Sequence, residues 1–547
     1  MFIRVKDKPN GKKSIQIVES YRRGDKVSQR IIRHIGQAVS DSEVEVMKQL
    51  AESIIIETKN TRQPVLPFFA PEDIYGKNTS KLYAPQDTVL VSDLREEQRI
   101  IEGIGDVFGK LYDDLGCNDL LGKQKNKNAI LKACVLARIA NPVSKMRTAS
   151  LLEEDYGITL PLEKIYRMMD ILSEREKEVK EHIGQRTLAL FREHVDVLFF
   201  DVTTLYFESI EKDELRANGF SKDNKINETQ IVIALVTTTQ GLPITYEIFP
   251  GNTYEGHTFI ETITKLKERF DVRHVQVVAD RGMFNEANLQ AMEKEGIEYI
   301  VAARLKNLPK AMKEKIMESR NYRGAVIHNE FHWLGEYEYN NRRLIVGYSS
   351  SRARKDRADR QRLIERLMKK VKEGKIKLRT IISNQGTKRF LSIIKDEAHI
   401  NEAKISEDAG WDGLHGVITN ANTHCTREEL ISRYRELWQI EEAFRINKHD
   451  LKMRPIYHWT PKRIKAHIAL CFIAYTLVKQ ALYRSKLQKM FLSFEQLRNE
   501  LLHVQSSILI HLKTKKKYRL PSKVTQNQKS IYRIFGLKRS EVPHDLA

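Results

Sequence analysis

The stretch Val195–Glu208, VDVLFFDVTTLYFE, is a run of β-branched and aromatic residues interrupted in its middle by Asp201. Its composition predicts a buried β-strand. A carboxylate is seldom buried unless it is paired with a cation or bound to a metal. Asp201 is therefore hard to explain as a residue that serves the fold alone.

Four similar runs follow in the chain, and helical patterns at 257–270 and 285–296 separate the later ones. Consecutive strands followed by alternating strands and helices predict a mixed sheet with helices packed against it, which is an α/β fold. The four runs are Gln230–Thr238, Leu242–Phe249, His274–Asp280 and Tyr299–Arg304.

The segments outside this sheet region have other patterns. Turn signals between alternating runs near the N-terminus predict a small hairpin-plus-helix module, an α+β unit, and a proline-bearing linker follows it. A long charged segment interrupts the α/β region before its last strand and helices. We therefore expect the N-terminal module and linker at 1–90, a helical domain at 91–190, the α/β domain in two parts at 191–304 and 415–480, a β-rich insertion at 305–414, and a small basic C-terminal appendage at 481–547 that holds KTKKKYR (513–519).

Lysine and arginine outnumber aspartate and glutamate by 93 to 72, which gives a formal charge of +21. This surplus favours a polyanionic partner such as nucleic acid, although a protein that is basic only for solubility has the same composition. The four cysteines lack zinc-site spacing, and so few of them are typical of a reducing cytosol. The apolar run IALCFIAYTLV at 468–478 is too short to span a bilayer and predicts a buried helix, so we expect no membrane partner.

A second carboxylate, Asp280, closes the apolar run HVQVVAD just before the turn Arg281-Gly282. The ordinary alternative at such a place is an aspartate that caps a strand end or a helix, and Arg281 could equally be a plain turn arginine. Asp280 alone therefore indicates little, and its meaning depends on Asp201 and on a third acidic residue.

That third residue is Glu441, in the helix-like segment YRELWQIEEAFRINK (434–448). The capping-box pattern TREE at 426–429 predicts that this helix begins near Thr426. Residues seven apart share a helix face, so Tyr434, Glu441 and Lys448 are expected on one apolar stripe. A buried salt bridge from Glu441 to Arg445 is the structural alternative.

Three acidic residues on separate core elements, Asp201, Asp280 and Glu441, suggest a single metal site. Hard cations such as Mg²⁺ take oxygen ligands, and two ions about 4 Å apart can activate a water and stabilise the leaving oxygen of a phosphodiester. A basic protein with such a trio is a candidate for phosphoryl transfer on nucleic acid.

Three motifs, DVTT (201–204), VVADRG (277–282) and YRELWQIEEAFRINK (434–448), resemble those of the DDE transposases of bacterial insertion sequences. The likeness covers roughly residues 140–480 and is to the insertion-sequence-four type and its sixteen-thirty-four-like subgroup, which has a box of Tyr, Arg, Glu and Lys at fixed spacing. It implies a ribonuclease-H-like catalytic domain interrupted by a β-rich insertion. It also implies that Asp201, Asp280 and Glu441 are catalytic ligands of Mg²⁺ or Mn²⁺, as two ions.

The resemblance further implies that Tyr434 and Lys448 contact DNA at the transposon end. Trp438 corresponds to a tryptophan that stacks near a flipped base in some relatives, and Arg281 is a candidate DNA contact. The chain departs from the box at Leu437, where the family has arginine. Arg435 or Arg445 could supply the missing phosphate contact.

The sequence thus predicts a DNA transposase, cytoplasmic and nucleoid-associated in a bacterium. We expect it to bind double-stranded terminal inverted repeats, to cleave element ends and to join the 3′-hydroxyl to target DNA, as a homodimer on DNA. Two alternatives remain at this point: a structure-specific nuclease of the same fold, and a catalytically silent DNA-binding regulator.

Overall fold

The computed structural model describes residues 2–9, 13–23, 26–38, 89–189, 197–207, 211–219, 228–253, 255–270, 276–279, 286–372, 390–394, 397–421 and 425–546, with a few helical residues between 43 and 52. The N-terminal module is a three-stranded antiparallel sheet of β1 (Phe2–Asp7), β2 (Lys13–Arg23) and β3 (Lys26–Ala38). A small apolar core that includes Ile15 and Ile17 packs under it. The prolines of the expected linker lie outside the described residues.

The helical region begins with a strand, β4 (Leu94–Ile101), which pairs antiparallel with β16 (Gln505–His511) from the other end of the chain. Together with β17 (Lys517–Pro521) and β18 (His544–Leu546) they form a four-stranded sheet, in the order β18-β17-β16-β4. The helices are α2 (Gly103–Asp114), α3 (Lys125–Ala140), α4 (Lys145–Tyr156), α5 (Leu162–Glu174) and α6 (Glu176–Ala189), with α15 (Phe494–Leu502) and α16 (Gln526–Ile534) from the C-terminal region.

The C-terminal region is therefore more than the appendage that its charge suggested. Phe494, Ile531 and Phe535 are buried in the same core as the helical region. The carboxylate of Glu102, just before α2, accepts a hydrogen bond from the Ser506 hydroxyl at 2.7 Å and pairs with Arg539 at 2.7 Å. Basic residues such as Lys513, Lys515 and Lys517 are exposed on the outside of this packed unit, whereas the side chain of Arg539 is buried beside Glu102.

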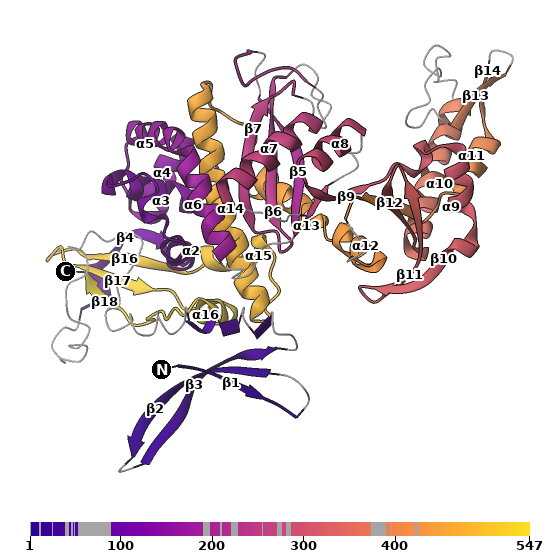
Figure 1. Cartoon of the computed structure of the whole chain (residues 1–547). Helices are drawn as coiled ribbons and strands as arrows, with labels where there is room; N and C mark the ends of the chain where they lie inside the picture. The colour runs from indigo at the N-terminus through magenta and orange to yellow at the C-terminus, as the bar shows by residue number, and fades with distance from the viewer. Residues whose placement is uncertain are drawn as a thin grey trace.

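A nine-stranded sheet forms the centre of the molecule, in the order β10-β11-β12-β15-β9-β8-β5-β6-β7 (Figure 1). Strand β5 pairs antiparallel with β6 and parallel with β8, and β8 pairs parallel with β9. The five strands predicted from the sequence are all present: β5 (Val197–Tyr206), β6 (Gln230–Thr238), β7 (Pro243–Pro250), β8 (Gln276–Ala279) and β9 (Glu298–Ala302).

The segment 305–414 supplies strands that continue this same sheet. β12 (Arg342–Tyr348) pairs with β15 (Leu414–Thr419), which in turn pairs with β9, and β11 (Glu330–Tyr339) and β10 (Tyr322–Ile327) complete the edge. The segment also contains α9 (Lys310–Met317), the long basic α10 (Ser350–Lys372), the hairpin β13 (Leu391–Ile394) and β14 (Glu397–Ile400), and α11 (Glu402–Ala409).

Both faces of the central sheet are covered by helices. Even-numbered residues of β5, such as Phe200 and Val202, pack with α7 (Glu255–Phe270) and α8 (Glu286–Lys294). Odd-numbered residues of β5, such as Phe199 and Leu205, belong to the core on the opposite face. The helices of that face are α12 (Arg427–Arg435), α13 (Trp438–Arg445) and α14 (Pro461–Leu487).

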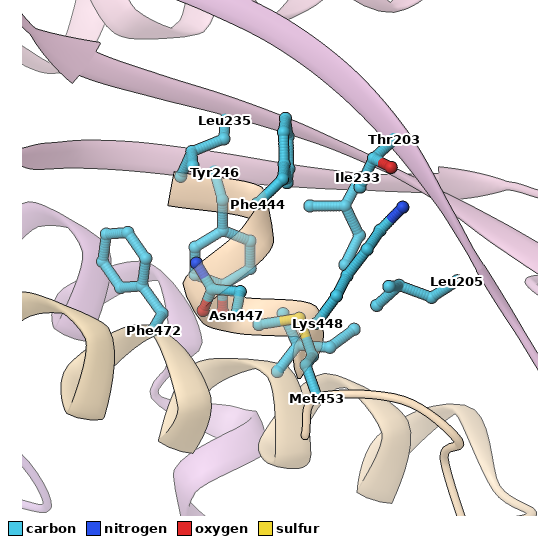
Figure 2. Close-up of a pocket in the computed structure, with 11 residues that line it drawn as sticks. Thr203, Leu205, Ile233, Leu235, Tyr246, Phe444, Asn447, Lys448, Met453 and Phe472 are labelled. Atoms are coloured by element: carbon cyan, nitrogen blue, oxygen red, sulfur yellow. The ribbon is translucent and has the colours of Figure 1, made fainter. Parts of the chain in front are cut away.

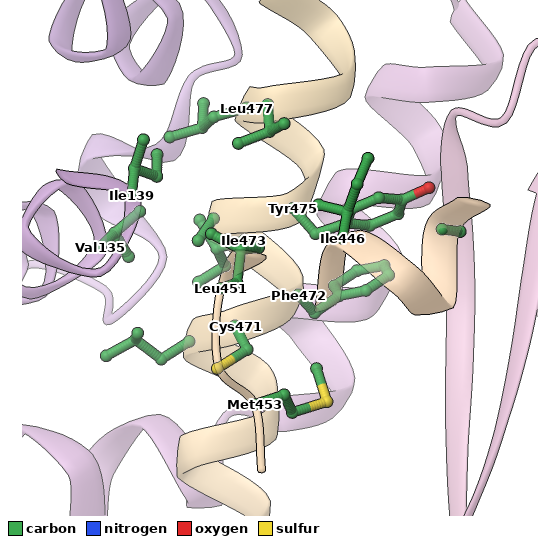
Figure 3. Close-up of a cluster of buried hydrophobic side chains, with 14 of the residues drawn as sticks. Val135, Ile139, Ile446, Leu451, Met453, Cys471, Phe472, Ile473, Tyr475 and Leu477 are labelled. Carbon is green, nitrogen blue, oxygen red and sulfur yellow. The ribbon is translucent and has the colours of Figure 1, made fainter. Parts of the chain in front are cut away.

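Helix α14 confirms the buried helix that was predicted from residues 468–478. It is the one helix of the described part that is long and apolar enough to cross a membrane, and 89% of its most apolar window is buried inside the protein. Figure 3 shows its side chains between Val135 and Ile139 of α3 on one side and Ile446 on the other. It joins the helical region to the central sheet.

Lys145 is a buried charge of the helical core whose cost can be tested. Lys145 is 4% exposed, and burial together with the nearby Arg138 lowers its pKa from 10.5 to about 7. The folded protein therefore binds fewer protons here than the unfolded chain between pH 7 and 10.5, so stability rises with pH across that window. Below pH 7 the buried ammonium is charged and its cost is fully present.

We expect Lys145→Met to stabilise the protein by about 2 kcal/mol at pH 6, because it removes that cost while keeping the apolar stem. Urea unfolding at pH 6 and pH 9 measures the effect, which should be smaller at pH 9. A destabilised variant at pH 6 would contradict this and show that the ammonium has a favourable partner.

Candidate active site

Asp201 lies in the middle of β5, on the odd-numbered face, which α12, α13 and α14 cover. Its side chain is half-buried, and one carboxylate oxygen, Oδ1, accepts a hydrogen bond of 2.7 Å from the backbone N–H of Val202. Its neighbour across the ladder is Leu235 on β6, and Thr203 lies two residues further along on the same face. Asp201 therefore points to the side of the sheet on which Glu441 is found.

Asp280 and Arg281 lie outside the described residues. Strand β8 ends at Ala279, one residue before Asp280, and Ala279 is in parallel register with Phe200, one residue before Asp201. The last residue of β8, which precedes Asp280 in the chain, therefore lies level with the residue of β5 that precedes Asp201.

The helix predicted across 426–448 is interrupted. Thr426 caps α12 as the capping-box pattern predicted, with its hydroxyl accepting from the N–H of Glu429. Helix α12 then ends at Arg435, α13 starts at Trp438, and residues 446–450 form a π-helical turn. The expectation of one continuous helix is wrong, because the chain turns at Glu436 and Leu437 and starts a new helix there.

This interruption changes which face carries Glu441. The buried residues of the second half are Leu437, Ile440, Ala443 and Ile446, whereas Glu441 is exposed. The expectation of a carboxylate within the apolar stripe is therefore wrong, since Glu441 is rotated about 100° from Ile440.

Glu441 makes no hydrogen bond or ion pair with any residue of the described part of the chain. The alternative of a buried Glu441–Arg445 salt bridge is also wrong, because Arg445 pairs with Asp450 at 3.4 Å. Glu442, the residue after Glu441, pairs with Lys479 of α14 at 3.1 Å. Burial lowers the pKa of Lys479, although the charge of Glu442 opposes this shift. Of the two adjacent glutamates, Glu441 is the one whose carboxylate is available.

Lys448, in the π-helical turn, lines a small and largely apolar cavity against the sheet (Figure 2). Its side chain extends along the cavity with its amino group directed toward Thr203. Phe444 lines the same cavity with Leu235, the ladder partner of Asp201. Because Phe444 lies beside the ladder partner of Asp201, α13 lies along β5 close to the level of Asp201. Glu441 precedes Phe444 by about one helical turn.

The other predicted DNA contacts are at the ends of these short helices. Tyr434 is half-buried near the end of α12, and Trp438 is 52% exposed at the first residue of α13. The turn between the two helices means that Tyr434 and Lys448 belong to separate elements. Their spacing of fourteen residues therefore does not describe their relation in space.

Leu437, the departure from the family box, is a core residue that is 6% exposed. Both arginines that could replace the missing one already have partners. Arg435 donates to His332 Nε2 at 2.8 Å and to Glu330 at 2.8 Å on β11, and burial together with the charge of Arg435 lowers the pKa of His332. Arg445 is 55% exposed in its side chain and pairs with Asp450.

Two positioning contacts had no signal in the sequence. Arg433 of α12 donates to the side-chain oxygen of Gln276, the first residue of β8, at 2.5 Å. The Lys479–Glu442 pair fixes α13 against α14. Both contacts join residues that are far apart in the chain, so neither spacing nor composition could have revealed them.

The donor set fits a hard divalent cation in its chemistry, since Asp201 and Glu441 offer carboxylate oxygens from two facing elements. Within the described ranges, no group of three His, Cys, Asp or Glu side chains gathers closely enough to hold a metal ion. Asp280 lies outside those ranges, so this finding does not include it.

Two segments of the chain match known protein families. Residues 195–477 match the family described as Transposase DDE domain, and residues 3–64 match the IS1634 family transposase, N-terminal domain. The comparison with curated proteins gives no match.

Among solved structures, the piggyBac transposase synaptic complex with hairpin DNA is similar with a TM-score of 0.34 at 9% identity, over 73% of this chain and 77% of that one. The Mos1 transposase paired-end complex with left transposon end has a TM-score of 0.15 at 14% identity, over 31% of this chain and 57% of that one. Likenesses at this level do not establish a shared fold.

Proposed function

The chain belongs to the DDE transposases of the IS1634 type, and we propose that Asp201, Asp280 and Glu441 form its catalytic site. As a member of this family it is a DNA transposase, an enzyme that cuts DNA and transfers strands. The observation that supports the site best is the packing of α13 on the Asp201 face of β5, with Phe444 beside Leu235 and the Lys448 amino group directed toward Thr203. This packing brings the helix that carries Glu441 to the strand that carries Asp201.

The proposal for Asp280 rests on register. Ala279 is opposite Phe200 in a parallel ladder, so continuing β8 by one residue would place Asp280 next to Asp201 of β5. The strand order β7-β6-β5-β8-β9, with β5 in the centre and only β6 antiparallel to it among its neighbours, supports the further proposal that this part of the sheet is ribonuclease-H-like.

We propose that two Mg²⁺ or Mn²⁺ ions bind at these carboxylates, where they would supply charge stabilisation for the attacking and leaving oxygens. Water attacks the phosphodiester at the element end, the bond between phosphorus and the 3′ oxygen breaks, and a free 3′-hydroxyl results. This hydroxyl then attacks a phosphodiester of the target, and the displaced target oxygen leaves.

The side chains around the carboxylates would orient the DNA. The ammonium of Lys448 lies on the Asp201 face and can bind a phosphate next to the scissile one. Tyr434, Trp438 and Arg281 are proposed as further DNA contacts, with Trp438 favoured by its exposure of 52%. The double-stranded partners are the terminal inverted repeats and the target DNA, in the cytoplasm at the bacterial nucleoid, and pairing of two ends calls for a homodimer.

We also propose the division of labour along the chain that the sequence suggested. Residues 1–90 and 91–190 would read the ends, and 191–304 and 415–480 would carry the chemistry, with 305–414 as an insertion between them. To this the structure adds the proposal that the basic region 481–547 supports the helical region. This proposal agrees with the burial of Phe494 and Ile531 in the core of that region.

Metal substitution tests the site directly. In Asp201→Cys we expect cleavage and strand transfer to fall sharply with Mg²⁺ and to return in part with Mn²⁺, because a thiolate ligand accepts the softer ion better. Glu442→Cys, next to Glu441 but paired with Lys479, is the control and should show no such metal preference. The assay uses pre-cut ends as well as intact ends, so that a nuclease without strand transfer is recognised.

Full activity with Mg²⁺ in alanine variants of Asp201, Asp280 or Glu441 would overturn the proposed trio. Cleavage without joining of pre-cut ends would instead overturn the strand-transfer step.

A further inference from the structure

The loop between the π-helical turn and α14 presents two aromatic rings to solvent. Tyr457 and Trp459 are each 60% exposed, whereas His458 between them is only 8% exposed. The loop is anchored by side chains that alternate with the exposed ones. These anchors are Leu451, Met453, Ile456 and His458, all of them buried.

The loop is held in place from below through His458 and Trp459. The His458 ring lies 6.4 Å from the Tyr166 ring and 5.4 Å from the His467 ring, between centroids. The Trp459 ring lies 6.0 Å from the guanidinium carbon of Arg216, which is itself 4% exposed and fixed by Asp213 at 2.7 Å. The fold therefore holds the Trp459 ring in place while leaving it exposed to solvent.

This loop is continuous with the candidate active site. Met453 lines the cavity of Lys448 and Thr203. Arg454 places its guanidinium carbon 5.3 Å from the ring centroid of Tyr206, the last residue of β5. Tyr206 is five residues beyond Asp201, which is about 17 Å along a strand. Arg216, which supports Trp459, lies 5.8 Å from the ring centroid of Phe207, the next residue after Tyr206, so the loop packs near the far end of β5 from Asp201.

Several cations lie in the loop or next to the residues that support it. Besides Arg216 and Arg454, Arg463 lies 4.4 Å from the Tyr166 ring that supports His458, and Lys452 is exposed at the start of the loop. Exposed aromatic rings beside arginines and lysines are the combination with which proteins bind unpaired nucleotides, because the rings stack on bases of any sequence and the cations follow the phosphates.

We propose that Tyr457 and Trp459 form a stacking platform for unpaired nucleotides of the DNA strand that flanks the cleaved end. The platform rests on the proposed function, since it takes its place from the Asp201 strand. It supplies strand positioning after the duplex opens, with Arg454 and Arg216 as its cationic supports, and it reads no sequence.

Binding of DNA measured with Ca²⁺ in place of Mg²⁺ tests the platform separately from catalysis. Two ligands are compared: an element end with a single-stranded flank of about six nucleotides, and the same end as a blunt duplex. We expect Trp459→Ala to weaken binding of the flanked end about tenfold and of the blunt end less than twofold, because only the first ligand offers bases to stack on. Trp459→Phe should restore most of the loss.

Phe491→Ala is the matched control, since Phe491 is 77% exposed but follows the far end of α14, about 40 Å along the helix. A 2-aminopurine placed in the flank should be quenched by the wild-type protein and not by Tyr457→Ala/Trp459→Ala. Equal losses on the two ligands would overturn the platform, as would no loss on either.

Loss of protein self-association in place of DNA affinity would also overturn it, because the rings would then serve a protein interface. Failure of the metal-substitution test with a preserved difference between flanked and blunt ends would reject the catalytic assignment but not the platform.

Discussion

Replacing Glu441 by glutamine is expected to lower the rate of DNA-end cleavage roughly a thousandfold, while Glu442→Gln leaves the chemistry near wild type. Glutamine keeps the shape of the side chain but removes the charge that a divalent cation requires, and loss of such stabilisation is worth several kcal/mol, with each ~1.4 kcal/mol a factor of ten in rate. Glu441 is exposed and without a partner in the described part of the chain, whereas Glu442 is paired with Lys479 at 3.1 Å.

Single-turnover cleavage of end DNA at saturating protein measures this difference. Affinity for DNA should be unchanged in Glu441→Gln, since removing a negative charge does not weaken phosphate contacts. Glu442→Gln leaves Lys479, whose side chain is 6% exposed, without its carboxylate, so a moderate loss of stability should appear in that variant alone. A fully active Glu441→Gln, or loss of cleavage in Glu442→Gln instead, would show that the wrong glutamate has been assigned.

Leu437→Arg, which recreates the family box, is expected to destabilise the protein by about 4 kcal/mol and not to improve DNA handling. Leu437 is 6% exposed, and it packs in the core at the turn between α12 and α13. An arginine there would bury an unpaired guanidinium or force the turn apart, and either outcome costs several kcal/mol. Thermal or urea unfolding measures the loss.

Leu437→Met is the control for this variant, because a volume-conserving change usually costs less than ~1.5 kcal/mol. A stable Leu437→Arg variant that binds element ends more tightly would contradict this view. It would mean that the turn can open to let the arginine reach DNA, as the family pattern suggests.

Glu441→Gln and Leu437→Arg both lie in the segment 426–448. In this segment the start of the helix depends on neighbouring residues, whereas its break depends on contacts with distant ones. The capping box at Thr426 was readable from four adjacent residues, because the groups that satisfy the helix start are neighbours in sequence. The break at Leu437 was not, because periodicity within 434–448 fits one helix as well as two. Packing against β5 and α14 decides between them, and it selects the broken form in which Glu441 is exposed.

By itself the sequence determined the five strands of the central sheet, the buried helix α14 and the candidate acidic residues, since each depends on composition over a short window. The tertiary structure alone decided that β4 pairs with β16 from the opposite end of the chain and that strands of the 305–414 segment join the central sheet. Strand pairing joins backbone groups that no local pattern marks, and its energy comes from surfaces that meet only after folding. The same reason explains why Glu441 and Glu442, adjacent and alike in sequence, have different surroundings in space.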